Sequence, residues 1–237
     1  MKIGIIQTRG LGDIVIAAPI AMYYIERGCE VYWPIDSDFL ESFSYAFPKI
    51  NFLGVDKNIT GSNTADFFYN NPLKLLNDIG CTQILCLYSY LTGFNFGNEK
   101  ISNCISFDAY KYAVSNVPLS EKWNLNIKRN PIKESNLFDR MNLLPSENYI
   151  VVHDQGSVHA ADFSKIMPNG MKTITIKPIT ENALDWLGVI EHAQSVYVVN
   201  SVYSNLIDQM NFKMEKFLHA NTEPKWTPIF LNKWNYI

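Results

Sequence analysis

The first residues with a type and spacing suited to chemistry lie in the stretch QTRGLGDIVIAAP, residues 7–19. Gly10 and Gly12 form a glycine turn after an apolar run, and Asp13 follows them directly. A glycine turn before a helix commonly lets a phosphate approach backbone N–H groups, whereas a carboxylate at the same helix start opposes anion binding. Asp13 therefore has two interpretations. It is a capping or first-turn acid of the helix, or it is a carboxylate that accepts a proton from a substrate hydroxyl.

A second group of polar residues follows predicted strands in the later part of the chain, within VHDQGSVHAADF, TIKPIT and NSVYSN. A nucleotide diphosphate needs hydrogen-bond donors at a helix N-terminus and usually a cation. The candidate donor-binding residues are His153, Gln155, Gly156, Ser157, Lys177, Asn200, Ser201 and Ser204. For each of them a structural role stays open: helix capping for Asn and Ser, a solvated loop for Lys177, and packing for histidine.

Apolar periodicity predicts strands that alternate with helices, which is typical of parallel sheets covered on both faces. In the first half we expect strands over residues 2–7, 30–34, 51–55 and 82–87, and a further one over 102–106. Helices are expected over 13–27, 38–47, 72–79 and 107–115. Pro19 falls inside the first of these helices and is expected to kink it, and Gly28 is expected to end it.

The stretch 115–146 is polar and marks the junction between two halves, with a helix near its end over residues 134–143. In the second half we expect strands over 149–153, 172–176, 195–199 and 215–219, and helices over 181–192 and 201–210. The predicted fold class is α/β, with two Rossmann-like halves, residues 1–140 and 145–237, whose parallel sheets face each other across a cleft. The final segment, EPKWTPIFLNKWNYI, is expected to pack back across the first half. Ligands should sit outside the carboxyl ends of the strands.

Composition narrows the classes of function. The chain has 237 residues and a net charge of −3, which argues against a nucleic-acid partner that neutralises phosphates. Its cysteines and histidines do not pair at ligand spacing, so no metal site is expected. No signal peptide is visible, and the apolar runs are shorter than the roughly 18 residues that span a bilayer. A cytoplasmic protein without a membrane span is expected.

A strand, the motif Thr-Arg-Gly-Leu-Gly-Asp-Ile and a helix with a proline six residues after the aspartate resemble the start of the heptosyltransferase-like glycosyltransferases (glycosyltransferase family 9). The resemblance implies the GT-B architecture, with the acceptor against the N-terminal half and the nucleotide sugar against the other. It implies that Asp13 is the general base and that Thr8, Arg9, Gly10 and Gly12 form the acceptor-side loop.

The activity implied is transfer of a hexosyl or heptosyl group from a nucleotide diphosphate sugar to a hydroxyl. The acceptor would be a glycan or a lipid-linked saccharide, in polysaccharide biosynthesis. Inversion at the sugar carbon is expected, with no metal and no other cofactor.

Two alternatives stay open. The family's late motif often reads Asp-Ser/Thr-Gly-x-x-His, and this chain has Asn200, Val202 and Asn205 at the acid, glycine and histidine positions. That departure favours a non-catalytic nucleotide- or glycan-binding relative with a degraded donor site. The other alternative is a Rossmann oxidoreductase or isomerase that uses a nicotinamide or flavin, although Val15 occupies the third glycine position of that fingerprint.

Overall fold

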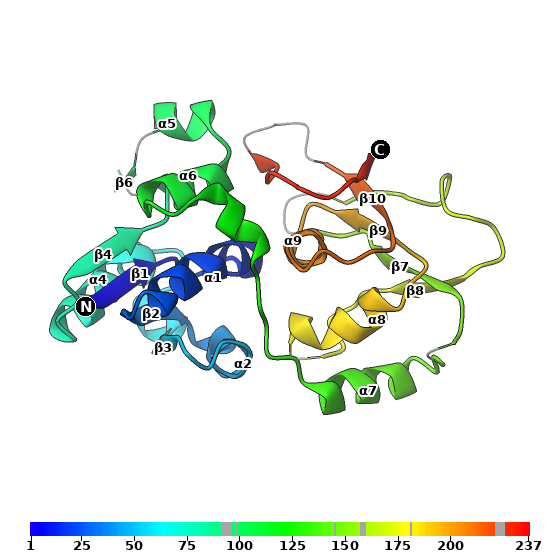
Figure 1. Ribbon diagram of the computed structural model, residues 1–237, viewed down its shortest axis with the longest axis horizontal. Coiled ribbons are helices and arrows are strands. Elements are labelled where there is room, and N and C mark those ends of the chain that lie inside the picture. The colour runs from blue at the N-terminus through cyan, green and yellow to red at the C-terminus, as the bar shows by residue number, and fades with distance from the viewer. Residues whose placement is uncertain (92–95, 98, 145, 157–159, 181, 221–225) are drawn as a thin grey trace. The chain divides into compact units, whose positions relative to one another are not determined.

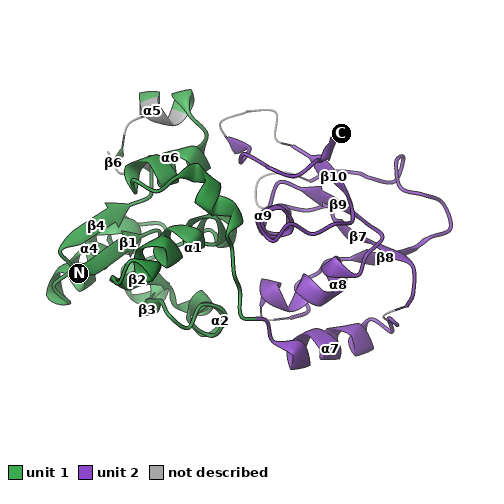
Figure 2. Ribbon diagram, viewed as in Figure 1, with its two compact units in different colours: residues 1–128 green, residues 129–237 purple. Residues whose placement is uncertain are grey.

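A computed structural model describes residues 1–91, 96–97, 99–144, 146–156, 160–180, 182–220 and 226–237 (Figure 1). The chain divides into two compact units, Met1–Lys128 and Arg129–Ile237 (Figure 2). Each unit contains a parallel sheet, which confirms the predicted α/β class with two Rossmann-like halves. The cleft between the halves stays a prediction.

The division between the units lies earlier in the chain than the predicted boundary at residues 140–145. Helix α7 (Pro131–Arg140) belongs to the second unit, because its Glu134 lies against Gly188 and binds Arg129. Arg129 also pairs with Glu191, so the residues before α7 are tied to the second unit by charge.

The first unit is built on a sheet with the strand order β3-β2-β1-β4. Its strands are β1 (Lys2–Ile6), β2 (Glu30–Asp36), β3 (Asn51–Val55) and β4 (Gln83–Cys86). Its helices are α1 (Leu11–Glu26), α2 (Leu40–Ala46), α3 (Lys57–Thr60), α4 (Asn71–Asp78), α5 (Glu99–Cys104) and α6 (Phe107–Val114). Shorter helical turns are η1 (Ser37–Phe39), η2 (Asp66–Asn70) and η3 (Leu119–Trp123), and β5 (Tyr90–Leu91) pairs antiparallel with β6 (Phe96–Gly97).

Helix α1 continues through Pro19 to Glu26 without a break, and the kink expected at the proline stays a prediction. Every residue from Ile14 to Ala21 is buried, so contacts on all sides hold this helix and outweigh the hydrogen bond that proline cannot donate. Helix α4 packs directly on β1, because a Cβ at Gly4 would lie 2.8 Å from a methyl group of Leu76.

The predicted strand over residues 102–106 was wrong, since Glu99–Cys104 forms α5. A run of five residues is too short for its periodicity to separate a strand from a helix.

The order of the strands places a topological switch point in the first unit between β1 and β4. From β1 the chain moves outward to β2 and β3, and then returns to pair β4 on the other side of β1. Loops that leave neighbouring strands in opposite directions open a crevice at the carboxyl ends of those strands. The residues that follow β1 and β4, Gln7 and Leu87, therefore lie at this crevice.

The second unit repeats this arrangement with the strand order β11-β10-β9-β7-β8. Its strands are β7 (Tyr149–His153), β8 (Lys172–Thr175), β9 (Ser195–Val199), β10 (Glu215–His219) and β11 (Asn235–Tyr236). After α7 its helices are η4 (Ala183–Trp186), α8 (Leu187–Glu191) and α9 (Val202–Gln209). The switch point lies between β7 and β9, so His153 and the residues after Val199 meet at the edge where a ligand is expected.

None of the helices in the described part of the chain combines the length and the apolar character needed to cross a membrane.

The C-terminal segment was expected to pack across the first half, but the structure joins it to the sheet of the second unit. Its strand β11 pairs in parallel with β10. Asp208 on α9 is fully buried, and its carboxylate accepts hydrogen bonds from Leu231 N at 3.1 Å, Asn232 N at 3.1 Å and Trp234 Nε1 at 3.0 Å. One aspartate therefore satisfies three donors of the tail.

We predict that Asp208→Ala lowers the free energy of unfolding by about 2–4 kcal/mol, because three tail donors lose their acceptor. Chemical denaturation measures this loss, and limited proteolysis should cut the tail first. Asp139→Ala, at an exposed position of α7, is the matched control and should change stability by less than about 0.5 kcal/mol. Equal stability of the two variants would contradict the role of Asp208.

Candidate functional site

Asp13 does not cap the helix in which it lies. The cap of α1 is Gly10, no side chain bonds the cap, and Asp13 lies in the first turn. Its Oδ1 lies 2.9 Å from Lys111 Nζ, and its side chain is 36% exposed. The structure therefore retains the first-turn interpretation but adds a cationic partner, and the carboxylate stays accessible from solvent.

Gly10 leaves room for the Asp13 carboxylate because it has no side chain. Its φ is +87°, and a Cβ built on it would lie 2.5 Å from Asp13 Oδ2. Any other residue would be strained in this backbone conformation and would also displace the carboxylate. The glycine three residues before the aspartate is thus explained by room for the Asp13 side chain. Gly12 follows as the second residue of α1.

Lys111 on α6 was not recognised from the sequence as a site residue. It is 3% exposed, and besides its ion pair with Asp13 its ammonium donates hydrogen bonds to Gln7 Oε1 at 2.7 Å and to Leu87 O at 3.2 Å. One feature of the sequence could have marked Lys111: it lies between two tyrosines in the helical run FDAYKYAV. A charge on an apolar helix face is rare unless it is paired, although the sequence does not name the partner.

The turn after β1 is closed by Tyr88, which follows β4. The Tyr88 hydroxyl accepts from Thr8 N at 2.9 Å and Arg9 N at 3.3 Å, and it lies 3.0 Å from Thr8 Oγ1. Burial raises the pKa of Tyr88, so its hydroxyl stays neutral. Because two amides of the glycine turn are already bound, the turn has fewer donors for the pyrophosphate of a dinucleotide cofactor. Arg9 itself is exposed and donates to Ser62 O at 3.2 Å.

In the second unit, the switch point brings His153 and Ser201 together. His153 Nδ1 lies 3.1 Å from Ser201 Oγ, and the His153 ring meets the Tyr203 ring edge-on at 4.7 Å between centroids. Burial lowers the pKa of His153 to about 4, and nearby Asp154 opposes this shift. His153 is therefore neutral near pH 7, with one ring nitrogen already engaged by Ser201.

Ser201 and Ser204 form a capping box at the start of α9, which is the structural role left open for them. Asn205 is 3% exposed, and its Nδ2 donates to Ser201 O at 2.8 Å. Its Oδ1 is buried and has no hydrogen-bond partner in the described part of the chain. Asn200 Nδ2 donates to Trp226 O at 2.7 Å. The polar side chains at this helix start are thus mostly engaged with the protein itself.

No contact among the described residues joins the other candidate donor residues to His153. Gln155 forms an isolated bridge with Ala160, and Gly156 follows it. Lys177 is exposed after β8, and its side chain has no hydrogen bond or ion pair with another described residue. Ser157 and the neighbouring His159 lie outside the described residues.

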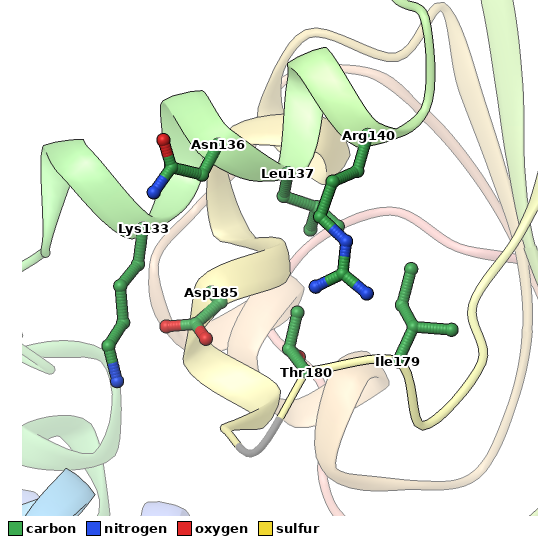
Figure 3. A pocket seen from close by; sticks show the side chains of 7 residues that line it. All are labelled: Lys133, Asn136, Leu137, Arg140, Ile179, Thr180 and Asp185. Atoms are coloured by element: carbon green, nitrogen blue, oxygen red, sulfur yellow. The ribbon is translucent and has the colours of Figure 1, made fainter.

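A pocket of about 290 Å³ lies in the second unit between α7 and the segment after β8 (Figure 3). Figure 3 shows Leu137 and Arg140 directed from α7 toward Ile179 and Thr180. The pocket is lined by Lys133, Asn136, Leu137, Arg140, Ile179, Thr180 and Asp185. None of the candidate residues predicted from the sequence lines it, so this hollow does not identify the donor site.

Within the residues that the structure describes, no three His, Cys, Asp or Glu side chains gather as they would around a metal ion.

No protein-family model matches this sequence, and no curated protein shows significant similarity to it. Among solved structures, the glycosyl transferase family 9 protein from Veillonella parvula matches with a TM-score of 0.65 and 12% identity, over 100% of this chain and 86% of that chain. The ADP-heptose lipopolysaccharide heptosyltransferase II of E. coli matches with a TM-score of 0.60 and 10% identity, over 100% and 90%. E. coli heptosyltransferase WaaC with ADP-2-deoxy-2-fluoro heptose matches with a TM-score of 0.55 and 10% identity, over 100% and 93%.

These likenesses extend over the whole chain and show that it shares the fold of heptosyltransferase-type glycosyltransferases. The resemblance stated from the TRGLGDI motif is thereby confirmed at the level of fold.

We predict that Gly10→Ala destabilises the protein more than Gly28→Ala does. Both glycines have a positive φ, and strain there costs about 1–2 kcal/mol, but nothing lies within 4 Å of a Cβ at Gly28. Gly10→Ala should cost about 1 kcal/mol more, because it displaces the Asp13 carboxylate from Lys111. Denaturant unfolding measures both losses. In an Asp13→Ala background the two substitutions should cost the same, whereas equal costs in the wild type would contradict the role given to Gly10.

We predict that His153 makes the protein less stable as the pH falls from 7 to 4. The folded-state pKa is about 4 and the unfolded value is about 6.5, so in this window the unfolded state binds the extra proton. The free energy of unfolding of the wild type, relative to that of His153→Gln, should fall by about 2–3 kcal/mol. Urea titrations at several pH values measure this difference, and a constant difference would show that His153 is not held neutral.

Proposed function

We propose that this protein is a glycosyltransferase that moves a sugar from a nucleotide diphosphate sugar to an acceptor hydroxyl, with Asp13 as the general base. The observation that carries the proposal is the accessible Asp13 carboxylate beside a buried lysine, at the switch point of a unit that shares its fold with glycosyltransferases. The cytoplasmic location stays a prediction.

The proposed step uses Asp13 to take the proton from the acceptor hydroxyl as its oxygen attacks the anomeric carbon of the sugar. The bond from that carbon to the diphosphate oxygen breaks, and the diphosphate leaves with the electron pair. In-line attack inverts the configuration at the carbon, and an ionised carboxylate is the form of the base that this step requires. A glycan or a lipid-linked saccharide would supply the hydroxyl.

The donor is proposed to bind in the second unit at the switch point between β7 and β9. Two solved heptosyltransferase structures with this fold contain ADP-2-deoxy-2-fluoro heptose or ADP, which supports a nucleoside diphosphate sugar as the donor class. The N-terminus of α9 and neutral His153 lie at this edge, and a helix N-terminus favours a diphosphate. Lys177 follows β8, the strand that pairs with β7, and we propose that it helps to stabilise the leaving diphosphate without a metal.

The alternative of a binding protein with a degraded donor site keeps specific support. Asn200 and Asn205 replace the acid and the histidine of the family motif, and Asn200, Ser201 and Ser204 are engaged in protein contacts. The nicotinamide or flavin alternative loses support, because Tyr88 occupies two amides of the glycine turn.

We predict that a nucleoside diphosphate raises the melting temperature of the protein and that Asp13→Asn keeps this shift. The same variant should lose sugar transfer by about 100-fold or more, because an amide cannot take the proton. Differential scanning fluorimetry with ADP, UDP and GDP, followed by assays with the matching nucleotide sugars, measures both effects. Asp78→Asn, an exposed position at the end of α4, is the control and should retain transfer.

Three results would separate the alternatives. Stabilisation by a nucleoside diphosphate without any transfer by the wild type would favour the binding protein. Stabilisation by NAD or NADP alone would favour the oxidoreductase. Transfer that survives Asp13→Asn would leave the protein a transferase with a different base.

A further inference from the structure

We propose that Lys111 is a positioning residue of this reaction. It binds Oδ1 of Asp13 and thereby leaves Oδ2 free to take the proton of the acceptor hydroxyl. The inference rests on the proposed function, because Lys111 acts only through Asp13.

Lys111 is fixed by three acceptors from three separate segments. Its Nζ lies 2.9 Å from Asp13 Oδ1 on α1, 2.7 Å from Gln7 Oε1 after β1 and 3.2 Å from Leu87 O after β4. Two of these contacts are hydrogen bonds, to Gln7 and Leu87, and the third is the ion pair with Asp13. Because the ammonium is engaged on three sides by the protein and the residue is 3% exposed, Lys111 is not placed to bind substrate itself.

Gln7 is itself held by hydrogen bonds, so the acceptor of the Lys111 ammonium has a fixed position. Gln7 is 1% exposed, its Nε2 donates to Arg9 O at 2.8 Å, and its backbone carbonyl accepts from Trp33 Nε1 at 3.1 Å. The amide oxygen therefore points at Lys111 because the amide nitrogen is committed elsewhere.

Asp13 is the carboxylate that forms an ion pair with Lys111, whereas Asp108, three residues earlier on α6, pairs with Lys122. Cys86 interacts electrostatically with Lys111, and Tyr88 interacts with Asp13. Burial raises the pKa of Cys86 to about 11, and burial also raises the pKa of Tyr88, so both are neutral at ordinary pH. The remaining neighbour is the Phe107 ring, 5.7 Å from Nζ. A buried ammonium without a compensating charge is costly, which favours an ionised and seated Asp13.

The two oxygens of Asp13 are therefore in different environments. Oδ1 faces the ammonium, whereas no hydrogen bond to Oδ2 occurs among the residues that the structure describes. Gly10 has no Cβ in the space that Oδ2 occupies. A general base oriented by a third group is the arrangement that activates many nucleophiles, and here the orienting group is a cation.

The test introduces Lys111→Met into two backgrounds, the wild type and the Asp13→Asn variant. In the wild-type background, Lys111→Met should lower kcat by about 10-fold or more, with KM for the nucleotide sugar within about 2-fold. In the Asp13→Asn background, Lys111→Met should cause no further loss, since Lys111 acts through the missing carboxylate.

Lys57→Met is the matched control, since Lys57 forms an exposed ion pair with Asp38 in the same unit. It should leave kcat and KM unchanged. If Lys111→Met does not fold, Lys111→Gln replaces it. Its amide can still donate to Asp13, so kcat should fall by less than about 10-fold while KM for the nucleotide sugar stays within about 2-fold.

A kcat that stays at the wild-type value in Lys111→Met, or in Lys111→Gln where it is needed, would overturn the proposal. So would additive losses in the Asp13→Asn background. Failure of the proposed function is distinguishable, because it would appear as full transfer by Asp13→Asn, or as no transfer by the wild type.

Discussion

Parallel pairing around one central strand in each unit is the constraint on which the candidate sites depend. Strand β1 pairs with β2 on one side and β4 on the other, and β7 pairs likewise with β8 and β9. Each pairing requires a long crossover, so residues distant in the chain meet at the carboxyl ends of adjacent strands. Gln7 and Leu87 meet at Lys111 for this reason, and His153 meets Ser201 for the same reason.

Local patterns predicted the strands well because each strand is a short run with several apolar residues, and β1, β7 and β9 are buried along most of their length. The bounds of β3, β7, β9 and β10 are those expected from the sequence. The errors occurred where tertiary contacts decide. The tail is directed by Asp208, a polar residue whose burial no local pattern reveals. The boundary of the units was misplaced because Arg129 reaches Glu134 and Glu191, and the sequence does not show such pairings.

The candidate site was predicted only in part, because some of its contacts are local in the sequence and others form only in the folded chain. Gly10 and Asp13 are three residues apart, so the sequence alone indicated that they lie together, and Gly10 leaves room for the carboxylate. Lys111 lies far along the chain from Asp13, and only the folded crossover brings the two side chains to 2.9 Å. In the second unit, Ser201 and Ser204 were ambiguous between capping and binding, since the same hydroxyls serve both uses.

The buried lysine also bears on how Asp13 can act as a base. An ammonium 2.9 Å from Oδ1 pairs with the carboxylate and holds that oxygen in place, which does not by itself make Asp13 a stronger base. The arrangement becomes useful if orientation limits the step more than basicity does. A carboxylate with one oxygen fixed offers the other at a defined angle and avoids reorganisation when the hydroxyl arrives. The hydroxyl becomes acidic only as its bond to the sugar carbon forms, so a weak base in a fixed position suffices. On this argument, the pairing of Asp13 with a buried lysine that is held by Gln7 and Leu87 is compatible with catalysis, and the exposed side of the carboxylate is where the acceptor must approach.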